Sequence, residues 1–297
     1  MVELEQLVTE MRNLKSRDLD QMSALEIATL LNSEDSYVLS AVNDVLPQIA
    51  TAIEWCSQAL FKGARIIYIG AGTSGRLGLL DAVECPPTFG VSSETVIGII
   101  AGGENAFVKA IEGAEDNEQF AIDDLKKINL KQEDVVIGIA ASGRTPYCIS
   151  GLNYAKSKGC KTISITNNPN SVMSSVADLA IELVTGPEVL TGSTRLKAGT
   201  AQKMALNMIS TGSMILNGKV YQNLMVDVMQ TNQKLVARAQ KIVMEATGCF
   251  KEEAVEYLTQ SEGNVKVAIV MILTGFSYEE AKNRLEVSNG FVGRAIK

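Results

Sequence analysis

Five short apolar runs, rich in β-branched residues, are the feature of this sequence that most constrains its fold. They alternate with helical stretches, and most are followed by Gly, Ser or Asn. Strands that are apolar on both faces and alternate with helices are typical of a doubly wound parallel sheet. The sequence therefore predicts an α/β fold with a five-stranded parallel sheet, whose strands are Ile66–Ile69, Val96–Ile100, Val135–Ile139, Thr162–Ile165 and Leu179–Val184.

Helices are predicted before and between these strands. The first 60 residues have a helical pattern, with a capping-box signature at Ser23–Glu26. A further helical stretch covers Tyr37–Lys62 and is expected to break near Pro47. Within the sheet region, the spacing of apolar residues predicts helices over Phe107–Lys127 and Pro146–Lys158.

The remainder of the chain is predicted to be mostly helical. Thr194–Leu216 forms a long helix candidate, and Gly218 is suited to cap its C-terminus. We expect two parts, an α/β domain with its N-terminal helical segment over residues 1–236 and a small helical bundle over residues 237–297. The helices expected in the bundle are Lys251–Gln260, Asn264–Leu273 and Tyr278–Leu285.

The chain has 297 residues and no histidine. This absence excludes Ser-His-Asp and Cys-His catalysis, HExxH zinc sites and imidazole proton shuttles. Acid–base chemistry near neutral pH must then use carboxylates, Lys, Tyr or Cys. The five cysteines are scattered and form no CxxC pair, which is typical of reduced thiols in a cytoplasmic protein and predicts no metal site.

The charge balance bears on the partners of the protein. With 27 basic and 34 acidic residues the net charge is −7, and there is no long basic cluster. Binding to nucleic acid or to an anionic membrane is therefore not expected. No apolar run reaches the roughly 18 residues needed to span a bilayer, and Met1–Glu5 is acidic where a signal peptide would be basic.

A glycine- and hydroxyl-rich loop over Gly70–Gly75 follows the first strand. Gly72 lets the backbone approach an anion closely, Thr73 and Ser74 add hydroxyl donors, and a helix starting at about Gly75 would direct its free N–H groups there. Its glycines also satisfy the dinucleotide pattern G-x-G-x-x-G. The acidic residue that this pattern requires at the end of the second strand is not clearly placed, so a single phosphate is favoured over NAD.

A second loop of the same kind follows the third strand. It contains Ser142, Gly143, Arg144 and Thr145, and Pro146 after it is suited to the first position of a helix. Two such loops at neighbouring strands could surround a phosphate with hydroxyls, N–H groups and a guanidinium. Either loop alone also fits an ordinary tight turn, and the pair is what indicates a phosphate site.

Two glutamates are candidates for acid–base chemistry. Glu84 precedes two prolines, which would hold its carboxylate in place, and Glu115 lies just before or at a helix start. An acidic residue at a helix start is often only a favourable interaction with the helix dipole. Because the chain lacks histidine, two positioned glutamates are nevertheless the natural acid–base pair.

Polar and basic residues crowd the start of the long helix near residue 194. Ser193, Arg195 and Lys197 lie in this stretch, which as a whole is a candidate for substrate binding. A basic, solvated first turn is the competing interpretation. That alternative is awkward, because cations are disfavoured at a helix N-terminus unless an anion or a carboxylate lies nearby.

Four stretches together resemble a known family. They are Ile69–Gly90 (IGAGTSGRLGLLDAVECPPTFG), Glu112–Asn117 (EGAEDN), Gly138–Tyr147 (GIAASGRTPY) and Thr191–Lys203 (TGSTRLKAGTAQK). The chain resembles, nearly end to end, the N-acetylmuramic acid 6-phosphate etherases. That family belongs to the sugar isomerase domain superfamily and is related to glucokinase regulatory protein. The helical tail is similar to the ubiquitin-associated-like C-terminal region of this family.

The resemblance implies a lyase that cleaves the D-lactyl ether of N-acetylmuramic acid 6-phosphate without a cofactor, in cell-wall amino sugar recycling or catabolism. It implies that Glu84 protonates the departing lactate oxygen and that Glu115 removes the C2 proton. It also implies a homodimer, and phosphate binding by the hydroxyls of Thr73, Ser74, Ser142 and Thr145. One small departure is Val83, where the family often has serine.

Two alternatives remain open at this point. A non-catalytic sugar-phosphate sensor would not need the glutamates, and an aldose–ketose isomerase could use the same phosphate site. Both glutamate motifs favour the lyase over the sensor. The ECPPT segment around Glu84 favours the lyase over a generic isomerase.

Overall fold

The chain divides into two compact units. A computed structural model describes residues 7–109, 111–228 and 233–297, so residues 1–6 of the predicted N-terminal helical region lie outside the described residues. The described parts of residues 1–83 and 94–210 form the first unit. The second unit combines residues 84–93 with the described parts of residues 211–297.

A five-stranded parallel sheet forms the centre of the first unit. The order is β2-β1-β3-β4-β5, and every neighbouring pair is parallel. The predicted doubly wound sheet is therefore confirmed. The residues of β1 and β3 are buried throughout, as expected of strands covered on both faces. The strands are β1 (Ile66–Gly70), β2 (Val96–Ile100), β3 (Val135–Ile139), β4 (Lys161–Thr166) and β5 (Leu179–Glu182).

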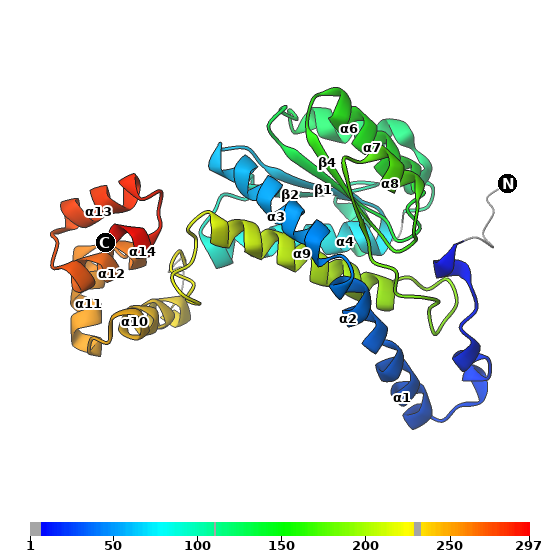
Figure 1. The fold of residues 1–297 in the computed structure, drawn as a ribbon, viewed down its shortest axis with the longest axis horizontal. Helices are drawn as coiled ribbons and strands as arrows, with labels where there is room; N and C mark the ends of the chain where they lie inside the picture. The colour runs from blue at the N-terminus through cyan, green and yellow to red at the C-terminus, as the bar shows by residue number, and fades with distance from the viewer. Residues whose placement is uncertain (1–6, 110, 229–232) are drawn as a thin grey trace. The chain divides into compact units, whose positions relative to one another are not determined.

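Helices cover both faces of this sheet. Figure 1 shows α6 (Glu118–Lys127), α7 (Pro146–Ser157) and α8 (Val172–Val176) on one side of the sheet. On the other side lie α3 (Leu46–Phe61) and α4 (Gly72–Phe89). The apolar layer under α6 and α7 joins Ile67 and Ile69 of β1 to Leu125 and Leu152 of the two helices.

The N-terminal part of the first unit consists of short turns followed by helices. Ser23 caps α1 with the predicted capping box, because its hydroxyl accepts from the N–H of Glu26 while the Glu26 carboxylate accepts from the N–H of Ser23. The predicted break near Pro47 is also confirmed, since Pro47 lies in the first turn of α3. The elements before α3 are η2 (Val8–Glu10), η3 (Leu14–Ser16), η4 (Leu19–Gln21), α1 (Ala24–Glu34) and α2 (Ser36–Asn43).

Backbone atoms of β1 and α4 approach each other through glycines. A Cβ atom on Gly70 would lie 2.8 Å from the backbone nitrogen of Gly75, and one on Gly75 would lie 2.7 Å from the carbonyl oxygen of Gly70. The helix begins at Gly72, three residues before the predicted start at about Gly75. Gly72 has a φ of +52°, which favours glycine. Thr73 and Ser74 consequently lie inside the first turn of the helix.

The predicted helix over Phe107–Lys127 is wrong in its first half. Residue 110 lies outside the described residues, and the chain around it forms α5 (Asn105–Val108), the 3-10 turn η5 (Ala114–Asp116) and then α6. Gly113 has a φ of +73°, in the left-handed region, which an α-helix cannot include. Asn117 then caps α6 by accepting from the N–H groups of Gln119 and Phe120.

The second unit contains the helical tail of the chain. All three helices predicted there are present, and Gly275 has a φ of +74° as the C-cap of α12. Their apolar faces share a core that includes Val243, Leu258 and Ile269. No helix among the described residues is both long and apolar enough to cross a membrane. The helices are α10 (Gln233–Thr247), α11 (Lys251–Gln260), α12 (Val265–Thr274), α13 (Tyr278–Val287) and α14 (Val292–Ala295).

The long helix α9 (Lys197–Leu216) begins three residues after its predicted start and ends where predicted. Gly218 follows it with a φ of +69°, and the N–H of Lys219 returns to the carbonyl of Met214. This is the C-capping role expected of Gly218.

We expect Gly75→Ala to destabilise the first unit by about 1–3 kcal/mol, because the added methyl group forces α4 away from β1. Urea denaturation followed by fluorescence measures this, since Trp55 in α3 is the single tryptophan. Gly199→Ala is the control: its Cβ would make ordinary contacts of 3.4 Å or more. Equal midpoints for Gly75→Ala and the wild type would contradict the close approach.

Candidate functional site

The two loops predicted to bind phosphate leave the sheet side by side. Strand β1 lies between β2 and β3, so the chain runs to one side after β1 and returns to the other side for β3. Gly70, at the end of β1, is in register with Ile139, at the end of β3. The loops therefore begin at the topological switch point, the place where ligands bind in open parallel sheets.

The first loop forms the start of α4. Ala71 precedes the helix and accepts from the N–H of Gly75 at 3.0 Å, and its methyl side chain cannot cap the remaining N–H groups. These N–H groups and the positive end of the helix dipole suit an anion. Thr73 is half-buried in this turn, whereas Ser74 is buried and its Oγ donates to Oε1 of Gln202 at 2.8 Å. Ser74 would have to release Gln202 in order to donate to a phosphate.

The second loop is held by its own backbone. Gly143 has a φ of +66°, and its carbonyl accepts from the N–H of Met173. The N–H of Arg144 donates to Oγ of Ser142. Thr145 is the N-cap of α7 without a capping side-chain bond, and Pro146 occupies the first turn as predicted. The hydroxyl of Thr145 is thus not used to cap the helix that it begins.

Glu115 lies in a turn beside α7, the helix that follows the second loop. It is exposed, in the turn η5, which packs against α7. The pKa of the Cys148 thiol is raised to about 12, mainly by burial and in small part by the negative charge of Glu115. Cys148 is in the first turn of α7, and the packing of η5 against α7 brings Glu115 close to that helix.

Glu84 lies in the last part of α4 and is exposed. Pro86 and Pro87 are inside the helix, so the carbonyls of Ala82 and Val83 receive no N–H from four residues ahead. Glu84 follows Ser74 by ten residues in the helix, which corresponds to about 15 Å along the axis. The predicted acid is therefore well separated along α4 from the loop at the helix start.

Lys197 does not face solvent, contrary to a simple surface-binding role. Its side chain is 2% exposed, and its ammonium group pairs with Oε2 of Glu34 at 2.8 Å. Asn13 donates to the same carboxylate oxygen, and Lys15 pairs with the other one. Ser193 is half-buried and Arg195 is exposed in the turn before α9. Lys197 therefore differs from Ser193 and Arg195, because it is buried whereas they are at least partly exposed.

A carboxylate lies at the basic start of α9. This answers the question, left open by the sequence, of what balances the cations there. Glu188 is buried and accepts from the backbone N–H groups of Lys197 and Ala198 at 3.1 and 2.9 Å. Burial raises the pKa of Glu188, although these two hydrogen bonds oppose the rise. The awkward basic helix start is therefore balanced from within the chain.

Residues that sequence analysis missed connect the two loops. Asn167 and Asn168 follow β4, and Gln202 lies in the second turn of α9. Asn167 and Asn168 both hydrogen-bond to the carbonyl of Ala141, at the start of the second loop. The sequence offers one signal for the asparagines, namely polar residues directly after a buried strand of a parallel sheet.

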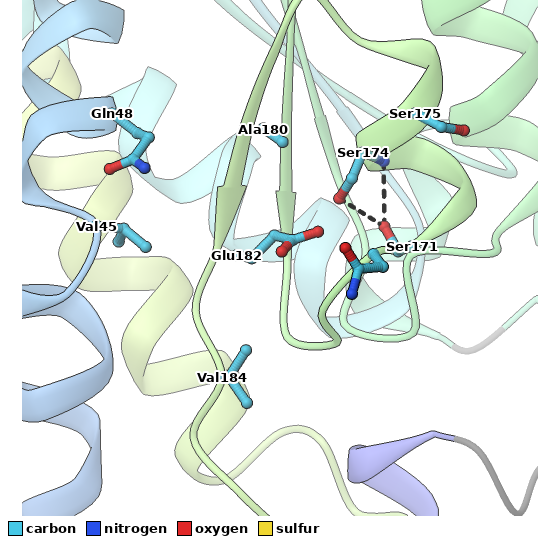
Figure 2. A pocket seen from close by; sticks show the side chains of 9 residues that line it. Val45, Gln48, Ser171, Ser174, Ser175, Ala180, Glu182 and Val184 are labelled. Atoms are coloured by element: carbon cyan, nitrogen blue, oxygen red, sulfur yellow. Dashed lines mark hydrogen bonds between the residues drawn. The ribbon is translucent and has the colours of Figure 1, made fainter.

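Two cavities adjoin this region. One of about 630 Å³ is lined by Asn13, Glu34 and Lys197. Figure 2 shows the other, of about 570 Å³, beside β5, where Glu182 and Gln48 line it together with Ser171, whose hydroxyl bonds to Ser174. Its described lining includes none of the site residues predicted from the sequence. This cavity therefore does not coincide with the predicted site at the switch point.

The fold and the paired loops define a SIS-domain protein. Residues 48–156 match the glucokinase regulatory protein N-terminal SIS domain, and residues 117–212 match the SIS domain. A solved candidate phosphosugar isomerase from Bacteroides fragilis shares the fold with a TM-score of 0.51 and 20% identity, over 65% of this chain and 91% of that one.

Closer relatives identify the family. An N-acetylmuramic acid 6-phosphate etherase from Exiguobacterium sp. is 58% identical over 99% of this chain and 100% of the relative. An etherase from Cronobacter sakazakii is 56% identical over 98% of both chains. The chain belongs to the N-acetylmuramic acid 6-phosphate etherase family, as the sequence motifs predicted.

We expect Lys197→Met to lower the free energy of unfolding by about 3 kcal/mol, because it removes one partner of a buried ion pair. Lys15→Met is the matched control. It breaks the exposed pair to the same carboxylate and should cost less than about 1 kcal/mol. Chemical denaturation at neutral pH measures both, and equal losses would contradict the assignment.

The same pair predicts a pH dependence of stability. Burial raises the pKa of Glu34, but hydrogen bonds from Lys15, Lys197 and Asn13 outweigh it and lower the pKa from 4.5 to about 2. A carboxyl group with a lowered pKa stabilises the fold above pH 4.5, and the stabilisation is lost as the pH falls from there towards 2. This loss should be smaller in Lys197→Met.

Proposed function

We propose that the protein cleaves the D-lactyl ether of N-acetylmuramic acid 6-phosphate, giving N-acetylglucosamine 6-phosphate and D-lactate. The observation that carries this proposal is the 58% identity to a named etherase over 99% of the chain. The motifs around Glu84 and Glu115 and the loop pair at the switch point support it.

The phosphate group would bind between the starts of α4 and α7. Thr73 lies in the first turn of α4, and Ser142 and Thr145 belong to the second loop. The backbone N–H of Gly72 would add a donor, because glycine lets the backbone approach the anion closely. Arg144 remains a predicted ligand, whereas Ser74 donates its hydroxyl proton to Gln202 and would have to release it to bind the phosphate.

Two carboxyl groups would carry out the reaction. In the open-chain form of the sugar, the C1 aldehyde acidifies the C2 proton. Glu115 would remove this proton as the C3–O bond breaks, and Glu84 would protonate the oxygen of the departing lactate. Water then adds across the C2–C3 double bond. The packing of η5, which contains Glu115, against α7 supports its role as the base.

A homodimer and a cytoplasmic location complete the proposal. Leu80 and Val83, which adjoin Glu84 on α4, are 47% and 62% exposed. Exposed apolar side chains grouped on one helix face are typical of an interface. The five cysteines, all among the described residues, form no disulfide, which suits a reducing compartment. The candidates for substrate binding still include Ser193, Arg195 and Lys197, although the side chain of Lys197 is buried.

Purified protein should release D-lactate from N-acetylmuramic acid 6-phosphate without an added cofactor. Glu84→Gln and Glu115→Gln should each abolish turnover and leave substrate binding largely intact, because each removes one proton-transfer group. Glu118→Gln, an exposed position at the start of α6, is the control and should keep full activity. Tight binding by the wild type with no lactate released would instead indicate a sensor.

We further expect the two inactive variants to complement each other when they are mixed and allowed to exchange subunits. If Glu84 of one subunit serves the site of the other, each mixed dimer contains one intact site and one doubly altered site. Recovery of about a quarter of the wild-type rate is then expected for random pairing. Sedimentation velocity should show a dimer, and a dimer without recovery would assign both glutamates to the same subunit.

A further inference from the structure

One chain of hydrogen bonds joins the two loops at the switch point. The backbone N–H of Asn167 donates to the carbonyl of Ala141, at the start of the second loop, at 3.0 Å. The side-chain Oδ1 of Asn167 accepts from Nε2 of Gln202 at 2.9 Å. Oε1 of Gln202 in turn accepts from Oγ of Ser74, in the first loop, at 2.8 Å. The loops are therefore connected through two amide side chains.

The partners of these side chains determine which atom donates and which accepts in each of these hydrogen bonds. Nδ2 of Asn167 donates to the carbonyl of Leu183 at 2.8 Å, so Oδ1 must face Gln202 and accept. Gln202 must then present its nitrogen to Asn167 and its oxygen to Ser74. A serine hydroxyl has one proton, and Ser74 uses it in this bond. The two amide residues in the middle of this series of hydrogen bonds are shielded from solvent, because Asn167 and Gln202 are each 1% exposed.

A second branch extends the network to the N-terminal segment. Nδ2 of Asn168 donates both to the carbonyl of Ala141 and to Oγ1 of Thr9, at 3.0 Å each. The N–H of Thr9 donates back to Oδ1 of Asn168. The second loop is therefore held to a chain segment more than a hundred residues away.

We propose that Gln202, supported by Asn167, is a positioning residue of the sugar-phosphate site. By accepting a hydrogen bond from Ser74, Gln202 holds the first turn of α4 at a set distance from the second loop. Ser74 thus acts through Gln202 rather than by donating to the phosphate. The proposal rests on the proposed function for the identity of the substrate, and it adds a role that the loop motifs do not assign.

The test is a double-mutant cycle with Ser74→Ala, Gln202→Met and the two combined. Each single change should raise the KM for N-acetylmuramic acid 6-phosphate about tenfold, with a much smaller change in kcat, because one positioning bond is lost. The double variant should show the same rise as either single one. Rises that multiply in the double variant would overturn the proposal, as would an unchanged KM in Gln202→Met. Gln260→Met, an exposed glutamine bonded within α11, is the matched control.

Gln202→Glu provides a readout that a general loss of packing would not change. The introduced carboxyl group keeps an acceptor for Ser74 but, when ionised, offers no proton to Asn167. Lowering the pH protonates it and restores the donor, so the rise in KM should shrink as the pH falls. A rise in KM that does not depend on pH, measured against the wild type at each pH, counts against positioning by Gln202.

The failure of this proposal is separable from failure of the proposed function. If the wild type releases no lactate, the dissociation constant of N-acetylglucosamine 6-phosphate, measured by calorimetry, replaces KM in the cycle. The same non-multiplying pattern is expected. Multiplying effects on that constant would overturn the positioning role independently of any catalysis.

Discussion

The contact between the backbones of β1 and α4 is the constraint on which the site depends. Side chains at Gly70 or Gly75 would separate the strand from the helix by the width of a methyl group at least. With the two backbones in contact, α4 begins directly beyond the carboxyl end of β1. The strand order places β3 next to it, so the second loop emerges within one strand spacing, about 4.8 Å, of the first.

Much of this arrangement could be predicted from the sequence because it follows from local patterns. The buried strands are continuous apolar runs, and Ser23, Pro146 and Gly218 mark helix ends with side chains whose chemistry is specific to those positions. The prediction of one helix over Phe107–Lys127 is wrong for an equally local reason. The apolar spacing is helical throughout, but the left-handed conformation of Gly113 ends any helix there.

The partners of the site residues could not be predicted, because they lie far away in the chain. Ser74 bonds to Gln202 across 128 positions and Lys197 to Glu34 across 163. Periodicity and turn chemistry contain no information at that range. Lys197 shows this limit, because nothing in the polar signature around it indicates that its ammonium group pairs with the buried carboxylate of Glu34.

The carboxylate of Glu188 affects where a dissolved anion can bind at the carboxyl edge of the sheet. Several helices begin here, and a free phosphate could in principle bind at any of them. At α9 the carboxylate of Glu188 is tethered to the chain and already bonded to two N–H groups. A tethered group has a high effective concentration, and a dissolved anion competes poorly with it. Glu188 thus occupies the start of α9 and leaves the starts of α4 and α7 for the proposed phosphate binding.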